Sequence, residues 1–89
     1  MPRVSAFYGI VITMYFDEKT HPGRPHFHAG YAGTRASYDI ENVERIVGEL
    51  PSHINRLVLK WSRLHRGELL LNWRLVRSGQ APDPIDPLR

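Results

Sequence analysis

The sequence predicts an α+β domain in which a small antiparallel β-sheet of three to four strands carries two C-terminal α-helices on one face. Between residues 10 and 40, apolar and polar side chains alternate with the two-residue period of strands. Between residues 52 and 78, apolar side chains instead recur at three- and four-residue spacing, as on one face of a helix. A sheet with one apolar face, followed by amphipathic helices, buries both surfaces best as a two-layer fold.

Composition indicates one small globular domain. The chain has 89 residues, 42% of them hydrophobic and 24% charged, with a net charge of +3. It has no cysteine, which excludes disulfides and thiolate sites and fits a reducing cytoplasm. No apolar stretch approaches the roughly 20 residues of a membrane helix, and the N-terminus does not lead into a signal peptide. We therefore expect a cytoplasmic protein with no membrane partner. Because so short a chain buries only a modest core, we also expect it to be stabilised by forming a homo-oligomer or by binding a cognate small protein.

Three segments form the predicted sheet, residues 43–47 are a possible fourth strand, and the first residues are either a strand or an arm. Residues 2–8 form a short strand or an extended arm, and residues 10–16 form a strand rich in β-branched and aromatic side chains. Pro25 opens the next strand, residues 25–31, after a polar loop. Residues 34–40 follow a tight turn, and residues 43–47 are a candidate for one more short strand.

A two-residue turn at Ala32 and Gly33 fixes the pairing of the strands on either side. It predicts three opposed pairs: Phe27 with Tyr38, His28 with Ser37, and His26 with Asp39. With this register the apolar faces of the two strands coincide, whereas a slip by one residue would place Phe27 on the polar side.

Two helical segments follow, or one kinked helix. Residues 52–65 begin at Ser52, a candidate N-cap, and place one apolar face opposite a basic one. The apolar positions are Ile54, Leu57, Val58, Trp61 and Leu64, and the basic positions are Arg56, Lys60 and Arg63. Arg66-Gly67 predicts a break, and residues 68–78 carry the stripe Leu69, Leu70, Trp73 and Val76 before Gly79 stops the helix. Residues 1–80 thus form the domain, and residues 81–89, with three prolines, form an extended tail.

The polar face of the sheet holds the residues that could carry chemistry, around the stretch His21-Pro22-Gly23-Arg24-Pro25-His26-Phe27-His28. Alternation turns His26 and His28 to the same side of their strand, away from Phe27. The seven polar-face residues are Thr13, Tyr15, His26, His28, Arg35, Ser37 and Asp39.

One interpretation is acid–base cleavage of RNA at its own 2′-hydroxyl. His26 and His28 would share the proton transfers, since imidazole titrates near neutrality. Asp39 would orient the His26 ring, and Arg24 or Arg35 would hold the phosphate. The competing interpretation of the His26–Asp39 pair is a surface ion pair without catalytic function.

Two other site types remain open. His21, His26 and His28 could ligate zinc or nickel if the loop brings His21 back, and no other cofactor is expected. Alternatively the surface only binds: Tyr15 can stack a base beside the arginines, and the basic stripe of residues 56–63 is a second candidate for phosphates. Such a stripe is more often simply the solvated side of a helix.

Three stretches resemble a bacterial family known as domain of unknown function 4160. They are the opening Met1-Pro2-Arg3-Val4-Ser5-Ala6-Phe7-Tyr8-Gly9-Ile10-Val11-Ile12, the motif Pro25-His26-Phe27-His28, and Leu64-His65-Arg66-Gly67-Glu68-Leu69-Leu70-Leu71-Asn72-Trp73. Members look like small proteins encoded beside a second small gene, an arrangement that resembles toxin–antitoxin pairs. The resemblance therefore implies a partner protein, and an RNase-like histidine site would suit the toxin.

Together these observations lead to one main expectation and two alternatives. The main expectation is a component of a toxin–antitoxin-type module that acts on or binds RNA through its histidine-containing sheet face. The first alternative is a non-catalytic protein-interaction domain, an antitoxin or adaptor, and the second is a histidine-based metal-binding domain.

Overall fold

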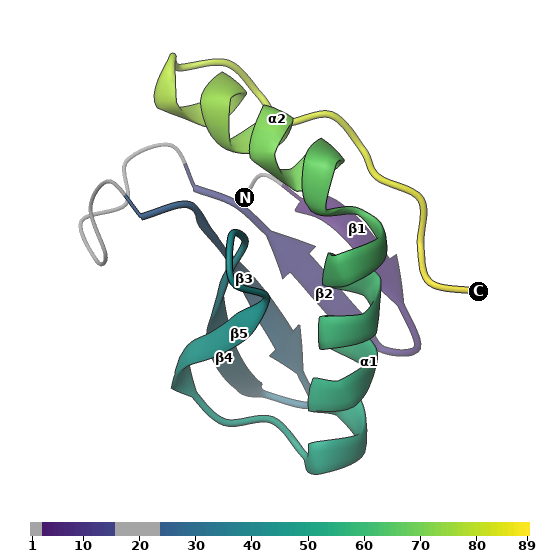
Figure 1. Ribbon diagram of the computed structural model, residues 1–89. Helices are drawn as coiled ribbons and strands as arrows, with labels where there is room; N and C mark the ends of the chain where they lie inside the picture. Colours follow the sequence, from purple (N-terminus) through teal and green to yellow (C-terminus); the bar gives the residue numbers. More distant parts are fainter. Residues whose placement is uncertain (1–2, 16–23) are drawn as a thin grey trace.

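Five antiparallel strands form one sheet, and the two helices lie over it (Figure 1). The computed structural model describes residues 3–15 and 24–89. The elements are β1 (Arg3–Phe7), β2 (Ile10–Thr13), β3 (His26–Tyr31), β4 (Thr34–Asp39), β5 (Glu44–Gly48), α1 (Ser52–Leu64) and α2 (Arg66–Arg77). The α+β prediction is confirmed, but three to four strands is too few. The first segment is a true strand, because it pairs along β2 instead of remaining an arm.

Tight turns set the register of two neighbouring hairpins. Tyr8 and Gly9, with φ angles of 50° and 79°, join β1 to β2. Ala32 and Gly33, with φ angles of 48° and 82°, join β3 to β4. Two successive positive φ angles are typical of the type I′ turn, whose twist matches that of the strands. The three predicted β3–β4 pairs are confirmed, including His26 opposite Asp39.

The core lies between the sheet and both helices, and the tail contributes to it. Ile12 and Met14 are fully buried, although β2 ends at Thr13 rather than at residue 16 as predicted. The rings of Phe27 and Tyr38 stack across β3 and β4 with centroids 5.4 Å apart. Trp61 of α1 meets Phe27 edge-on at 5.8 Å, so the helix is anchored on the predicted apolar face.

The two helices are separate, and the break falls at His65, one residue before the predicted one. Gly67 is inside α2. Pro51 rather than Ser52 occupies the N-cap position of α1, and no side chain caps this end. Leu64 is 65% exposed, so the last position of the predicted apolar face is not buried.

Gly79 ends α2 as predicted, with a φ angle of 84°. The Gly79 N–H donates to the Val76 carbonyl at 3.1 Å, and the Gln80 N–H donates to the Leu75 carbonyl at 2.8 Å. This pair of hydrogen bonds is the Schellman motif, which glycine favours because it has no Cβ to clash at positive φ.

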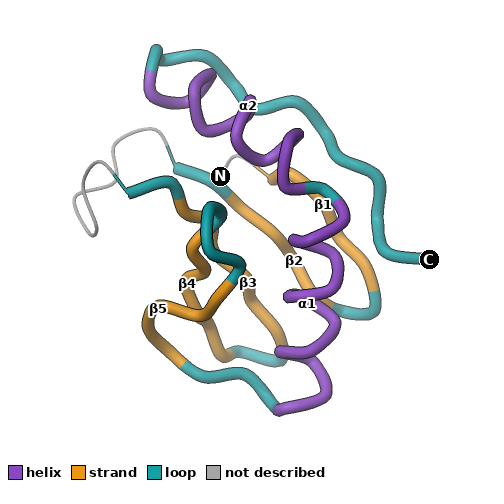
Figure 2. Tube along the Cα trace, viewed as in Figure 1, coloured by secondary structure: helices purple, strands orange, loops and turns teal. Residues whose placement is uncertain are grey.

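The proline-rich tail lies along the domain beside α2 and β1 (Figure 2). The side-chain amide of Asn72 clamps it, since Asn72 Oδ1 accepts from the Asp83 N–H at 2.8 Å and Nδ2 donates to the Asp83 carbonyl at 2.9 Å. Further along, the Ile85 N–H donates to the Val4 carbonyl of β1 at 2.9 Å. Ile85 and Leu88 are buried in the core. The tail therefore covers the outer edge of β1.

Candidate functional site

His26 stands at the start of β3, and its ring is buried rather than turned to solvent. The residue is 2% exposed. Its ring packs against Trp73 of α2 with centroids 5.0 Å apart, and Nδ1 lies 2.6 Å from the Arg24 carbonyl oxygen. A carbonyl only accepts, so Nδ1 carries the hydrogen and donates it. The expectation that His26 and His28 both face solvent is therefore wrong for His26, because α2 reaches this end of the sheet.

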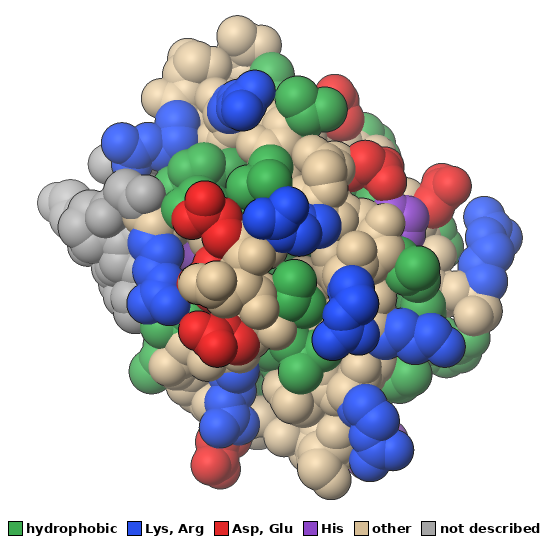
Figure 3. All heavy atoms as spheres, viewed as in Figure 1, with side chains coloured by type: hydrophobic (Ala, Val, Ile, Leu, Met, Phe, Trp, Pro, Cys, Tyr) green, Lys and Arg blue, Asp and Glu red, His purple; other side chains and the backbone are tan. Residues whose placement is uncertain are grey.

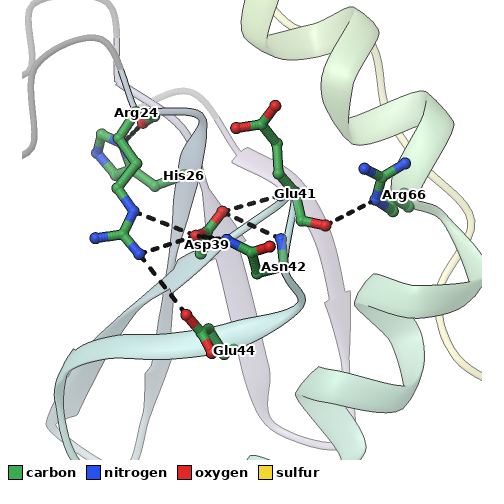
Figure 4. A network of polar contacts seen from close by, with 7 residues as sticks. All are labelled: Arg24, His26, Asp39, Glu41, Asn42, Glu44 and Arg66. Atoms are coloured by element: carbon green, nitrogen blue, oxygen red, sulfur yellow. Dashed lines mark hydrogen bonds and ion pairs between the residues drawn. The ribbon is translucent and has the colours of Figure 1, made fainter.

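Asp39 faces His26 across the two strands, but its carboxylate is held by other residues (Figure 4). Its Oδ2 accepts from Arg24 Nη2 at 2.9 Å and Nε at 3.2 Å, and from Asn42 Nδ2 at 3.0 Å. Its Oδ1 accepts from the Glu41 N–H at 2.9 Å. Within the described part of the chain, Asp39 thus makes no hydrogen bond to the His26 ring, and the orienting contact predicted for a catalytic pair is absent.

The electrostatics of Asp39 indicate an ionised anchor. Burial raises the pKa of the carboxyl group, but the hydrogen bonds from Arg24, Asn42 and Glu41 outweigh it and bring the pKa below its ordinary value of 3.8. A proton acceptor in catalysis needs a pKa nearer to neutrality. Asp39 therefore fixes the β4–β5 turn, and Arg24, expected at a phosphate, is engaged here instead.

His28 belongs to a second group on the polar face. It is half-buried, its Nδ1 lies 3.1 Å from Ser37 Oγ, and its ring meets the Tyr15 ring edge-on at 4.9 Å. Arg35 Nη2 donates to the Tyr15 hydroxyl at 2.5 Å, and the guanidinium lies 5.5 Å from the centre of that ring. We call Tyr15, His28 and Arg35 the Tyr15 cluster. The structure thus brings two of the three predicted nucleic-acid contacts, Tyr15 and Arg35, next to His28, whose ring also lies 5.4 Å from the ring of His26.

An open hollow of about 300 Å³ lies beside the Tyr15 cluster. It is lined by Tyr15, Arg35 and six neighbours from β2, β3 and β4, namely Val11, Thr13, Gly30, Tyr31, Gly33 and Thr34. Gly30, one of the lining residues, has no side chain that could fill the hollow. Alternation along β2 and β3 places Val11 and Gly30 on the same face as Thr13 and Tyr15, but alternation alone does not reveal that a hollow lies among them.

The network around Asp39 was missed as well. Its sequence signal is local, because Asp39 and Asn42 stand at the two ends of a tight turn, where Asp and Asn often bond to nearby backbone. Arg66 of α2 extends the network by donating from Nε to the Glu41 carbonyl at 3.1 Å (Figure 4). These contacts tie the β4–β5 turn to both β3 and α2, which is a structural function.

The predicted metal set includes His21, which lies outside the described residues. Among residues 3–15 and 24–89, no three His, Cys, Asp or Glu side chains lie close enough to hold a metal ion. The helices found in the same ranges are all too short or too polar to cross a bilayer.

Comparison with known proteins identifies a family but no described function. No curated protein matches the chain, and no solved structure matches it. A family model described as a domain of unknown function (DUF4160) matches residues 9–74, which include β2 to β5, α1 and the Pro25-His26-Phe27-His28 motif. Since this match covers well over half of the chain, the protein belongs to the DUF4160 family.

Proposed function

We propose that the protein is a component of a toxin–antitoxin-type module and that it binds single-stranded RNA through the Tyr15 cluster. The observation that carries the proposal is the contact between Arg35 and Tyr15, which places a guanidinium and an aromatic ring side by side at an open hollow. Single-stranded RNA is recognised by stacking on aromatic rings and by guanidinium contacts to phosphate. The toxin–antitoxin-type module is supported by the family resemblance, because members look like small proteins encoded beside a second small gene.

The burial of His26 favours binding over cleavage. Cleavage at a 2′-hydroxyl needs a base and an acid that both reach the reacting group. His26 is 2% exposed with Nδ1 engaged, and Asp39 is 1% exposed and ion-paired to Arg24. His28 is the histidine of the predicted pair that contacts Tyr15, which lines the hollow, and one imidazole of this kind suits recognition of a base or phosphate.

RNA affinity tests the proposal directly. Fluorescence anisotropy with a labelled RNA of about 12 nucleotides and mixed sequence should show binding that weakens as salt rises. Tyr15→Ala should weaken binding by about tenfold, because stacking on an aromatic ring contributes about 1–3 kcal/mol per base. Arg35→Ala should have an effect of similar size and also flatten the salt dependence.

Arg74→Ala is the matched control, since it removes the same charge from an exposed position on α2. Equal losses in Arg74→Ala and Arg35→Ala would mean that RNA responds only to net charge, and the assignment of the Tyr15 cluster would then fail.

A second experiment separates binding from cleavage and tests the module. The purified protein should leave the same RNA intact on a denaturing gel, and RNA that is cut by the wild type but not by His28→Ala would assign His28 to catalysis instead. In cells, expression of the protein alone should arrest growth, and Arg35→Ala should relieve the arrest. Unimpaired growth with the wild type would mean that the protein is not the toxin of the module.

A further inference from the structure

The outward side of α1 carries cations that nothing in the described structure neutralises. Arg56, Lys60 and Arg63 are exposed, and they recur at four- and three-residue spacing along one face. The helix contains no Asp or Glu. Among the described residues, no ion pair or hydrogen bond involves any of these three side chains, whereas the guanidinium of Arg24 is engaged by Asp39.

Positive charge is also concentrated in the C-terminal part of the chain. Residues 51–89 contain seven Lys and Arg against three Asp and Glu, a net charge of +4. Residues 1–50 contain five against six, a net charge of −1. Figure 3 shows Lys and Arg side chains gathered over the part of the surface that α1 forms, with hydrophobic side chains between them. An acidic partner would be attracted to this side of the molecule.

Apolar side chains accompany these cations. A hollow of about 630 Å³ along α1 is lined by Leu57 and Leu59 together with four basic or titratable side chains, His53, Arg56, Lys60 and Arg63. Leu57 and Leu59 are half-buried. Leu64, seven residues after Leu57 and therefore on the same side of the helix, is 65% exposed. We call Leu57, Leu59, Leu64 and the four basic or titratable side chains the α1 surface.

We propose that the α1 surface docks an acidic amphipathic helix of a partner protein. Carboxylates of the partner would pair with Arg56, Lys60 and Arg63, and its apolar side chains would cover the leucines between them. An apolar centre within a polar rim is the usual anatomy of a protein interface, and a helix lying in a groove is a recurrent mode of peptide recognition. A nucleic-acid backbone would satisfy the cations but would leave the three leucines uncovered.

The α1 surface is independent of the Tyr15 cluster. The inner side of α1 covers the apolar face of the sheet through Trp61 and Val58, so its outer side points away from the sheet (Figure 1). Tyr15, His28 and Arg35 lie on the opposite face of the sheet. A partner on α1 and an RNA strand on the sheet therefore do not compete for the same residues, and each proposal can fail without the other.

A random 14-residue peptide display library, panned on the full chain, tests the proposed partner chemistry. The peptides recovered should be acidic, with Leu, Ile or Met at three- and four-residue spacing. They should fail to bind the double variant Arg56→Glu/Lys60→Glu. The matched control Arg45→Glu/Arg74→Glu, which reverses two exposed charges on β5 and α2, should bind them as the wild type does. Recovery of neutral or basic peptides, or equal binding by both variants, would overturn the proposal.

Anisotropy with one recovered peptide then separates the charged and apolar contributions. Arg56→Glu/Lys60→Glu should weaken its binding at least tenfold, and Leu64→Ser should weaken it several-fold without disturbing the fold, because Leu64 is mostly exposed. Circular dichroism checks that each variant is folded. The affinity for the 12-nucleotide RNA should be unchanged in the α1 variants. If RNA affinity falls and peptide binding persists, the α1 surface is a nucleic-acid site and the docking proposal is wrong.

Discussion

The start of β3 and the outer side of α1 are both rich in polar side chains, but they use them in opposite ways. Beside the start of β3, Asp39 at the end of β4 is almost fully buried and accepts hydrogen bonds from Arg24, Asn42 and Glu41. On α1, Arg56 and Lys60 are exposed and have no counterpart in the described structure. The first set holds the domain together, and the second set is available to a ligand.

The contrast shows that burial decides what a polar residue can do. A charge removed from water must be compensated inside the protein, which leaves it little capacity for a ligand. An exposed cation keeps its hydration, contributes little to stability, and can exchange water for a partner's carboxylate at small cost. A histidine and an aspartate that a sequence pattern places opposite each other are therefore weaker evidence for a binding site than exposed cations that have no partner within the protein.

Of the substitutions that test this contrast, Asp39→Asn should have the largest effect on the free energy of unfolding. The substitution keeps the shape of the side chain but removes the charge that Arg24 and Asn42 stabilise. We expect the free energy of unfolding to fall by about 3 kcal/mol, because the substitution breaks a buried charged network. Urea denaturation followed by circular dichroism measures it.

Glu44→Gln is the control for that measurement. Glu44 also approaches Arg24, at 3.8 Å, but its side chain is 59% exposed. Its loss should change the free energy of unfolding by less than about 0.5 kcal/mol. Similar effects at the two positions would show that the network at Asp39 is not the buried anchor described above.

A smaller effect on the free energy of unfolding is expected when the pH is lowered and Asp39 becomes protonated. The folded-state pKa of Asp39 is lowered from 3.8, so its ionised form stabilises the fold above that value, and this contribution is lost as the pH falls through the lowered pKa. The difference in unfolding free energy between the wild type and Asp39→Asn should therefore be constant near neutrality and shrink below about pH 4. Urea titrations of both proteins between neutrality and pH 3 measure this difference. A difference that grows towards low pH would reverse the sign assigned to the shift.

The smallest effect is expected on the α1 surface. Lys60→Gln should leave the free energy of unfolding unchanged or raise it by about 0.2–0.5 kcal/mol, because it removes a like-charge pair with Arg56 at four-residue spacing. Thermal and urea unfolding measure it, and a loss of more than about 1 kcal/mol would mean that Lys60 has a structural partner and that the two regions do not differ as described.

Much of the fold could be predicted from local patterns. The two-residue period fixed which side chains of β3 and β4 face the core, and the turn at Ala32 and Gly33 fixed their pairing. Helical periodicity located both helices, and Gly79 marked the end of α2. The β1 strand was harder to predict, since a short alternating segment becomes a strand only when a neighbour pairs with it.

The candidate site was predicted less well, for a reason visible at His26. The sequence by itself determined that His26 shares a face with His28 and lies opposite Asp39, because both relations follow from strand geometry and one turn. Only the tertiary structure decided that Trp73 covers His26, that Arg24 engages Asp39, and that the last residues of the chain cover β1. Periodicity reports the direction in which a side chain leaves its own element, whereas burial depends on which distant element arrives there.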